Sequence, residues 1–156
     1  GSGTCFDLYF PASSQSALPV SSFFTDNRLP TGKGERVAIV ERDSRMLEMV
    51  EEKVAALGYE PSGVSTLTAL LDDLEDATDR PDLAIIDLSF TGSSSLQDLA
   101  RCLRGVPYLL TTDRSDKRSS KYRLSLGPGL LIKPFSSSAL AYAIHERMNG
   151  STKKSR

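Results

Sequence analysis

The stretch "PDLAIIDLSF", residues 81–90, decides the fold of this chain. Its centre, Leu83 to Asp87, is a short apolar run that ends on a carboxylate, as expected for a parallel strand covered by helices on both faces. Working outward, similar apolar runs recur at Val37 to Val40, Tyr108 to Thr112 and Leu130 to Ile132, and a weak strand is indicated around Glu60 to Val64. The sequence therefore predicts five strands.

Helical patterns separate these strands. After the first strand, apolar residues follow at spacings of three and four, with Asp43 or Ser44 as N-cap and Gly58 as the stop. Further helices are predicted to begin near Ser65 or Thr66, near Ser95 and near Ser136 or Ser137, and the polar stretch Asp113 to Leu126 is predicted as a helix with few apolar contacts. Strands alternating with helices predict an α/β fold, a doubly wound five-stranded parallel sheet of the (βα)5 type.

Composition limits the possible functions. The 156 residues are enough for one domain with an appendage. A net charge of -1 argues against nucleic acid as the partner. The two cysteines, Cys5 and Cys102, lie far apart without a CxxC motif, so we expect reduced thiols and no zinc site. No apolar run approaches the roughly 20 residues that span a bilayer, so we expect no direct membrane contact by this fragment.

The N-terminal part differs from the rest. Residues 4–10 alternate apolar and polar side chains, which is the pattern of a half-buried strand. Residues 12–34 are rich in Ser, Pro and Gly without periodicity, so we interpret them as a flexible linker. The main domain is then expected over residues 35–149, followed by a disordered basic tail at residues 150–156.

Charged and hydroxyl side chains mark the ends of the predicted strands. Glu41, Asp87, Thr112 and Lys133 each stand at the carboxyl end of a strand, where parallel sheets gather their chemistry. An exposed aspartate there can attack a phosphoryl group if cations and donors balance the negative charge. Acidic residues after the first strand would hold Mg2+, and a hydroxyl and an ammonium would each meet a phosphoryl oxygen.

These motifs make residues 37–148 similar to the receiver domain of bacterial two-component response regulators, which has a flavodoxin-like fold. The resemblance implies that Asp87 in "PDLAIIDLSF" is the phosphoacceptor, Thr112 in "VPYLLTTD" the switch hydroxyl and Lys133 in "LLIKPF" the conserved-type lysine. It also implies Mg2+ as cofactor, held by Glu41 and Asp87, and a cis peptide bond before Pro134. The expected partner is a histidine kinase or a histidine phosphotransfer protein.

The first motif departs from the family pattern. The family carries two carboxylates after the first strand, whereas this chain has Glu41 and Arg42. A guanidinium cannot bind metal, so we expect Arg42 to repel Mg2+ or to pair with Asp87 in its stead. Alternatively, Arg42 points away and leaves room for the ion. Asp43, one residue farther along, is a further candidate metal ligand from the start of the helix.

A second resemblance covers the N-terminus. "GTCFDLYFP", residues 3–11, is similar to the last strand of the ATP-binding domain of sensor histidine kinases. We therefore interpret residues 1–11 as a remnant of that domain. A kinase end, a linker and a receiver follow one another in hybrid histidine kinases. The resemblance implies a cytoplasmic location, with the parent kinase anchored in a membrane.

Three functions stay open at this point. The first is a phosphorelay receiver that accepts a phosphoryl group on Asp87 and passes the signal on by conformational change. The second is a receiver-like interaction module that works without phosphorylation. The third and weakest is a phosphatase with Asp87 as nucleophile; the haloacid dehalogenases of this type carry a second carboxylate two residues on, where this chain has Ser89.

Overall fold

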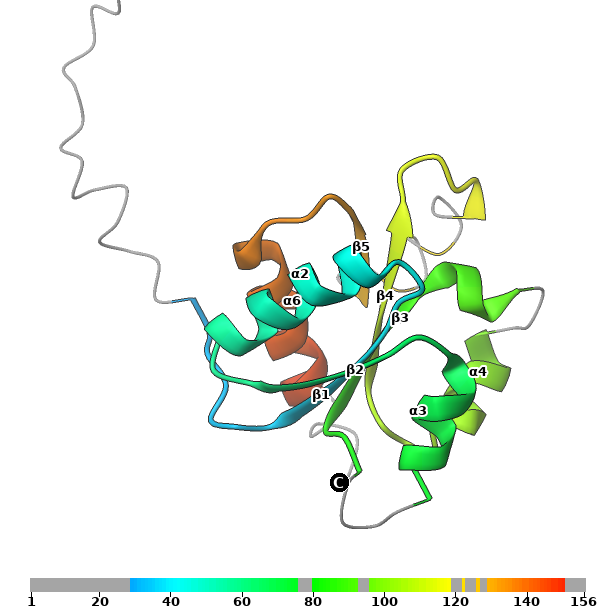
Figure 1. Cartoon of the computed structure of the whole chain (residues 1–156), viewed down its shortest axis with the longest axis horizontal. Coiled ribbons are helices and arrows are strands. Elements are labelled where there is room, and N and C mark those ends of the chain that lie inside the picture. The colour runs from blue at the N-terminus through cyan, green and yellow to red at the C-terminus, as the bar shows by residue number, and fades with distance from the viewer. Residues whose placement is uncertain are drawn as a thin grey trace, which may run out of the picture.

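A computed structural model describes residues 29–75, 80–92, 96–118, 122, 126 and 129–150. Its five strands form one sheet: β1 Arg36–Val40, β2 Glu60–Val64, β3 Leu83–Asp87, β4 Tyr108–Asp113 and β5 Leu130–Lys133. All neighbouring strands pair in parallel, in the order β2-β1-β3-β4-β5 (Figure 1). The predicted five-stranded parallel sheet is confirmed. The order reverses direction between β1 and β3, which opens a crevice at the carboxyl ends of these strands.

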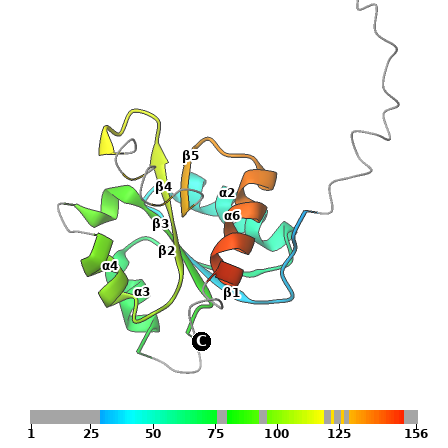
Figure 2. The same ribbon diagram turned by 180° about the vertical axis from the view of Figure 1, so that it is seen from behind.

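Helices cover both faces of the sheet. The α-helices of the described residues are α2 Ser44–Ala56, α3 Leu67–Asp73, α4 Leu96–Cys102 and α6 Ser137–Gly150. Helices α2 and α6 lie on one face and α3 and α4 on the other, as the two opposite views show (Figures 1 and 2). The short 3-10 helix η1, Leu88–Thr91, was not predicted. Of the helix predicted from Asp113, the first residue belongs to β4, and much of the remainder lies outside the described residues.

Short polar side chains begin these helices. One carboxylate oxygen of Asp43 accepts from the backbone N–H groups of Arg45 and Met46 at 2.9 and 3.0 Å, so Asp43 is the N-cap of α2. Thr66 caps α3, and the Ser136 hydroxyl accepts from the third residue of α6. Such caps satisfy backbone donors that the first helical turn leaves free, and each contributes about 1 kcal/mol. They settle the alternatives that the sequence left open at these three helix starts.

Alternating strand residues divide the core into two layers. Toward α2 and α6, the sheet contributes Val37, Ile39, Leu83, Ile85, Leu109 and Leu131. Toward α3 and α4, it contributes Ala38, Val40, Ala84, Ile86, Leu110 and Leu130. Burying each large aliphatic side chain stabilises the fold by about 1.5–3 kcal/mol. Because both faces of β3 are buried, its end is held rigidly, and Asp87 is the residue at that end.

The predicted strand at residues 1–11, most of the linker and residues 151–156 of the tail lie outside the described residues. The last part of the predicted linker lies against the domain. Leu29 packs on the core, and the backbone N–H groups of Gly32 and Gly34 donate to the carbonyls of Leu57 and Gly58 at 2.8 and 2.9 Å. The packed domain therefore includes residues 29–34. In the described part of the chain, every helix is too short or too polar to cross a membrane.

Candidate functional site

Three of the predicted site residues come together at one edge of the sheet. Glu41 follows β1, Asp87 ends β3 and Lys133 ends β5. Since parallel strands end at the same edge, these side chains share one pocket. The pocket is lined by Glu41, Arg42, Asp43, Met46, Asp87, Ser89, Asp113 and Lys133. It contains four carboxylates and two cationic side chains.

Lys133 connects the two buried carboxylates of this pocket. Its ammonium Nζ donates to Oδ2 of Asp87 at 2.5 Å and also to Oε2 of Glu41. Glu41 and Asp87 are each 7% exposed and Lys133 is 9% exposed, so water screens these contacts weakly. The peptide bond between Lys133 and Pro134 is cis, as the resemblance implied. The result is a compact charged group made from three strand ends.

The pKa values of this group reflect burial opposed by pairing. Burial alone would raise the pKa of Asp87, but hydrogen bonds from Lys133 and from Ser89 hold it below its usual value. The backbone N–H of Ser89 donates to Oδ1 of Asp87 at 2.7 Å. Burial would likewise lower the pKa of Lys133, but Asp87 and Glu41 raise it above its usual value. Both groups are therefore charged at neutral pH.

Glu41 is held by its own backbone neighbours as well. Its Oε1 accepts from the N–H groups of Arg42 and Asp43 at 2.9 and 3.2 Å, while its Oε2 receives the Lys133 ammonium. The Asp87 carboxylate is also engaged at both oxygens. Asp43 lines the pocket but uses one oxygen to cap α2. The carboxylates predicted to bind metal thus already serve internal donors.

Arg42 does not occupy the position that the sequence favoured. Its side chain is exposed, and its guanidinium lies over the ring of Phe90, 4.6 Å from the centroid. The cation against Asp87 is Lys133, so the predicted pairing of Arg42 with Asp87 is wrong. Phe90 was not anticipated, because it lies on the unpredicted turn η1. An aromatic residue three positions after Asp87 was the only signal in the sequence.

Thr112 is not among the residues that line the pocket, although its neighbour Asp113 is. It is buried, and its hydroxyl donates to the carbonyl of Asp113 at 3.4 Å. In the register of the sheet, Thr111 is the neighbour of Asp87, and successive strand residues point to opposite faces. The structure thus gathers Glu41, Asp87 and Lys133, whereas Thr112 borders the loop that follows β4.

That loop contains an arginine that sequence reasoning missed. Arg118 pairs with Asp116, Nη2 to Oδ2 at 2.8 Å, and its Nη1 donates to the carbonyl of Gly92 at 2.9 Å. Hydrogen bonds from Arg118 lower the pKa of Asp116, and burial offsets only part of this effect. A hydrogen bond from Thr112 lowers the pKa of Asp116 further. The hydrogen bond to Asp116 and its charge raise the pKa of Arg118, and the negative charge of Asp87 adds a smaller contribution in the same direction. Arg118 therefore ties the loop after β4 to the turn after Asp87.

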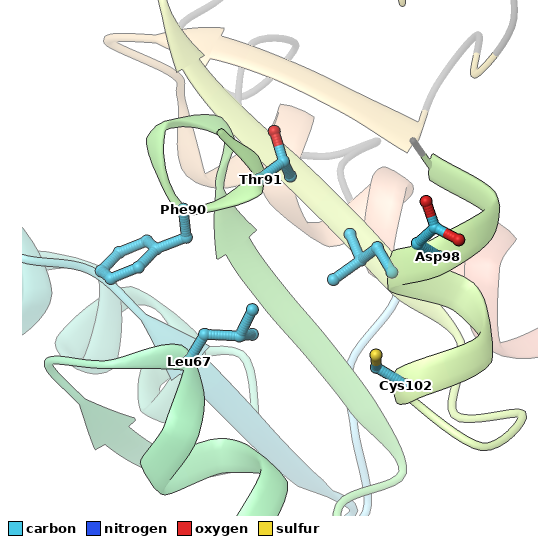
Figure 3. A pocket seen from close by; sticks show the side chains of 6 residues that line it. Leu67, Phe90, Thr91, Asp98 and Cys102 are labelled. Carbon is cyan, nitrogen blue, oxygen red and sulfur yellow. The ribbon is translucent and has the colours of Figure 1, made fainter. Parts of the chain in front are cut away.

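A second, apolar pocket lies on the α3 and α4 side of the sheet (Figure 3). It is lined by Leu67, Phe90, Thr91, Asp98, Leu99 and Cys102. Cys102 is an exposed free thiol there, and Cys5 lies outside the described residues. Phe90 thus contacts Arg42, a residue of the charged pocket, and also lines the apolar pocket. The turn η1 is the wall that the two pockets share.

Mg2+, the ion that the resemblance implies, has strict requirements of its ligands. Mg2+ requires octahedral oxygen ligands at close range and gives up its water reluctantly. Here both oxygens of Glu41 and of Asp87 have internal donors, and Arg42 stands where the family has a second carboxylate. Among the described residues, no group of three or more His, Cys, Asp or Glu side chains is arranged to hold a metal. These residues do not fit Mg2+ as they are placed.

Comparisons with solved structures agree with the fold. A response regulator receiver domain from Clostridium thermocellum is 18% identical, with a TM-score of 0.62 over 76% of this chain and 98% of that chain. A putative response regulator from Chloroflexus aurantiacus is 23% identical, with a TM-score of 0.61 over 75% of this chain and 99% of that chain. NtrX from Brucella abortus aligns over 78% of this chain and 28% of its own, with a TM-score of 0.64 and 14% identity.

These likenesses concern three-dimensional structure. No protein-family model matches the sequence. The chain has the fold of response regulator receiver domains, as the resemblance implied.

Proposed function

We propose that this domain is a signalling receiver in which Asp87 accepts a phosphoryl group from a histidine donor. The observation that carries the proposal is the placement of Asp87 and Lys133 at the carboxyl ends of β3 and β5 in a receiver fold, with the ammonium 2.5 Å from a carboxylate oxygen. Histidine kinases and histidine phosphotransfer proteins are the donor classes that suit this chemistry.

The transfer has a simple balance. A carboxylate oxygen of Asp87 attacks the phosphorus of a phosphohistidine, the P–N bond breaks, and the imidazole leaves with a proton from solvent. An acyl phosphate remains on Asp87. The Lys133 ammonium shifts from the carboxylate to a phosphoryl oxygen, and the Ser89 N–H helps to orient the aspartate. The donor protein supplies the phosphohistidine and solvent supplies the proton, while this chain supplies the attacking carboxylate, the ammonium and the backbone N–H.

The signal would leave through the loop after β4. A phosphoryl group on Asp87 adds negative charge close to Arg118, which holds Gly92 and Asp116 in the present state. Stronger attraction toward Asp87 would favour a different position of Arg118 and would loosen the loop that borders Thr112. A partner that reads this loop would then distinguish the two states.

A second function is favoured by the site charges. Lys133 already compensates both buried carboxylates, and the donor set does not fit Mg2+. A receiver-like interaction module that works without phosphorylation would need no more than this. In that function, the ion pair holds the strand ends in one fixed arrangement for a protein partner.

Incubation with acetyl phosphate separates the two functions. Intact-mass spectrometry of the 156-residue chain is expected to show one added phosphoryl group, which Asp87→Asn abolishes and Asp82→Asn, a change at an exposed aspartate, does not. Beryllofluoride is expected to shift the amide signals of Ser89 and Arg118. If neither reagent changes the protein, the interaction module is the function that survives.

The parent protein is part of this proposal. The N-terminal resemblance to a kinase domain supports a hybrid histidine kinase, with this receiver on the cytoplasmic side of the membrane. Transfer from the phosphorylated kinase part of the longer protein to Asp87, followed with radiolabelled ATP, tests that arrangement. A kinase that never labels the receiver contradicts it.

A further inference from the structure

We infer that the Lys133 ammonium is the resident cation of the charged pocket and that this receiver works without a bound divalent metal. The inference concerns which cation fills the pocket, so it stands whether or not Asp87 accepts a phosphoryl group. It starts from one contact: Lys133 Nζ donates to Glu41 and to Asp87 at once. A metal that bridged these carboxylates through the same oxygens would compete with the ammonium.

Displacement is unfavourable because the ammonium is buried with its partners. Lys133 is 9% exposed, and its ammonium contacts the carboxylate that follows β1 and the one that ends β3. A buried ammonium that loses both carboxylates keeps its charge without compensation, which costs several kcal/mol. Mg2+ would also lose part of its tightly held water shell.

Arg42 closes the other route to a metal site. A carboxylate at this position would add oxygen ligands to those of Glu41 and Asp87, whereas the guanidinium adds positive charge and offers only donors. Arg42 is one of the lining residues, and its guanidinium stacks on Phe90 of the adjoining turn η1. Asp43 cannot take over fully, since one of its oxygens caps α2.

The pocket nevertheless contains enough carboxylates for a metal site. Four carboxylates line it, and only two cations oppose them. Removing either cation should therefore make the pocket attract a divalent ion. A change of Arg42 to Asp both removes positive charge and adds a ligand, and a change of Lys133 to Met frees two carboxylates. These two variants test the inference from different sides.

The experiment titrates Mg2+ into the isotope-labelled 156-residue chain and follows its amide spectrum, with Mn2+ as a second, signal-broadening probe. The unchanged protein is expected to show no saturable response at Arg42, Asp87 or Ser89 at millimolar Mg2+. Arg42→Asp is expected to bind Mg2+ at least tenfold more tightly, as a rough guide from opposite charges close together. Lys133→Met is expected to gain affinity in the same direction.

Matched controls separate a local site from general charge. Arg45→Asp makes the same charge change in the first turn of α2, at an exposed residue outside the pocket lining, and should leave Mg2+ binding unchanged. Lys117→Met is the corresponding control for Lys133, because Lys117 is exposed. Circular dichroism checks that each variant is folded. If Lys133→Met is unfolded, Arg42→Asp still tests the inference, because it retains Lys133.

Each outcome of the Mg2+ titration either supports or overturns the inference that Lys133 takes the place of a metal. Saturable Mg2+ binding around Asp87 in the unchanged protein overturns the inference, as does the absence of any gain in both pocket variants. A gain in Lys133→Met alone supports the ammonium as the occupant, and a gain in Arg42→Asp supports the role of the guanidinium. Because no phosphoryl donor is present, these results do not depend on whether Asp87 can be phosphorylated.

Discussion

Lys133 and Asp87 join the ends of β5 and β3 through a contact of 2.5 Å between Nζ and Oδ2. The strands are not neighbours, since β4 lies between them in the sheet. The Lys133 side chain therefore reaches past the end of β4 to Asp87, and its ammonium also contacts Glu41, which follows β1. One ammonium thus holds three strand ends, which makes the stability of the domain and the chemistry of Asp87 depend on the same group.

Lys133→Met is expected to destabilise the domain by about 3–5 kcal/mol, because it leaves two buried carboxylates without a cation. Urea unfolding followed by circular dichroism measures the free energy of unfolding. Lys117→Met should change it by no more than about 0.5 kcal/mol, as for an exposed residue. The triple variant with Glu41→Gln, Asp87→Asn and Lys133→Met should recover much of the loss. A single variant as stable as the unchanged protein would show that the pair contributes little.

The pH dependence of unfolding follows from the same pair. The pKa of Asp87 is depressed in the folded state, so its contribution is complete above the usual aspartate pKa of 3.8 and is lost as pH falls through the lower folded value. The pKa of Lys133 is raised, so its contribution is complete below the usual 10.5 and is lost as pH rises through the higher folded value. Between these limits the pair contributes a constant amount.

Asp87→Asn provides the measurement. Relative to this variant, the unchanged protein should lose stability on acidification below the usual aspartate range, and the difference between the two should be flat near neutrality. Asp82→Asn, at an exposed position, serves as the comparison. If the difference instead grows as pH falls, the folded pKa of Asp87 is raised and the assigned pairing is incorrect.

The strands were predictable because both faces of the sheet are buried. Four of them read as continuous apolar runs, whereas β2, with the sequence EPSGV, is a partly buried strand that the sequence indicates only weakly. The bounds of β2 and β3 agree with the predicted ones. Each N-cap could be predicted only as a choice between two adjacent residues. Asp43 and Ser44, for example, differ only in which backbone donors their side chains can reach. Local chemistry fixes these features, so they are visible in one sequence.

The site was less predictable because it depends on competition between distant cations. The sequence shows Arg42 next to Glu41, but it does not show that Lys133, 46 residues beyond Asp87, reaches both carboxylates. The turn η1 has too few residues for a periodic pattern, and therefore Phe90 was missed as the partner of Arg42. Arg118 lies in a polar loop whose contacts come from tertiary structure alone.

The contact between Arg42 and Phe90 is expected to contribute about 0.5–1 kcal/mol, as for cation–π pairs at exposed sites. A double-mutant cycle with Arg42→Ala and Phe90→Leu isolates this coupling, and leucine retains an apolar side chain for the pocket between α3 and α4. Arg45→Ala with Phe90→Leu is the control cycle and should show no coupling. Additive effects in the first cycle would mean that the stacking has no energetic role.

Arg118 gives the last prediction, which concerns the coupling of two loops. Arg118→Ala removes the link between Asp116 and the carbonyl of Gly92, so the amide of residue 118, which donates to Asp116 at 2.8 Å, should exchange with solvent faster. Total stability should change by less than about 1 kcal/mol, because the pair is partly exposed.

Hydrogen exchange followed by NMR measures this effect residue by residue. Arg114→Ala, at an exposed arginine in the same loop, should leave the exchange of residue 118 unchanged. Arg118→Lys should restore only part of the protection, since a single ammonium cannot bond Asp116 and Gly92 in the fixed geometry of a guanidinium. Faster exchange that also extends to Ser89 would show that Arg118 supports the turn after Asp87, whereas unchanged exchange at residue 118 would contradict the proposed link between the two loops.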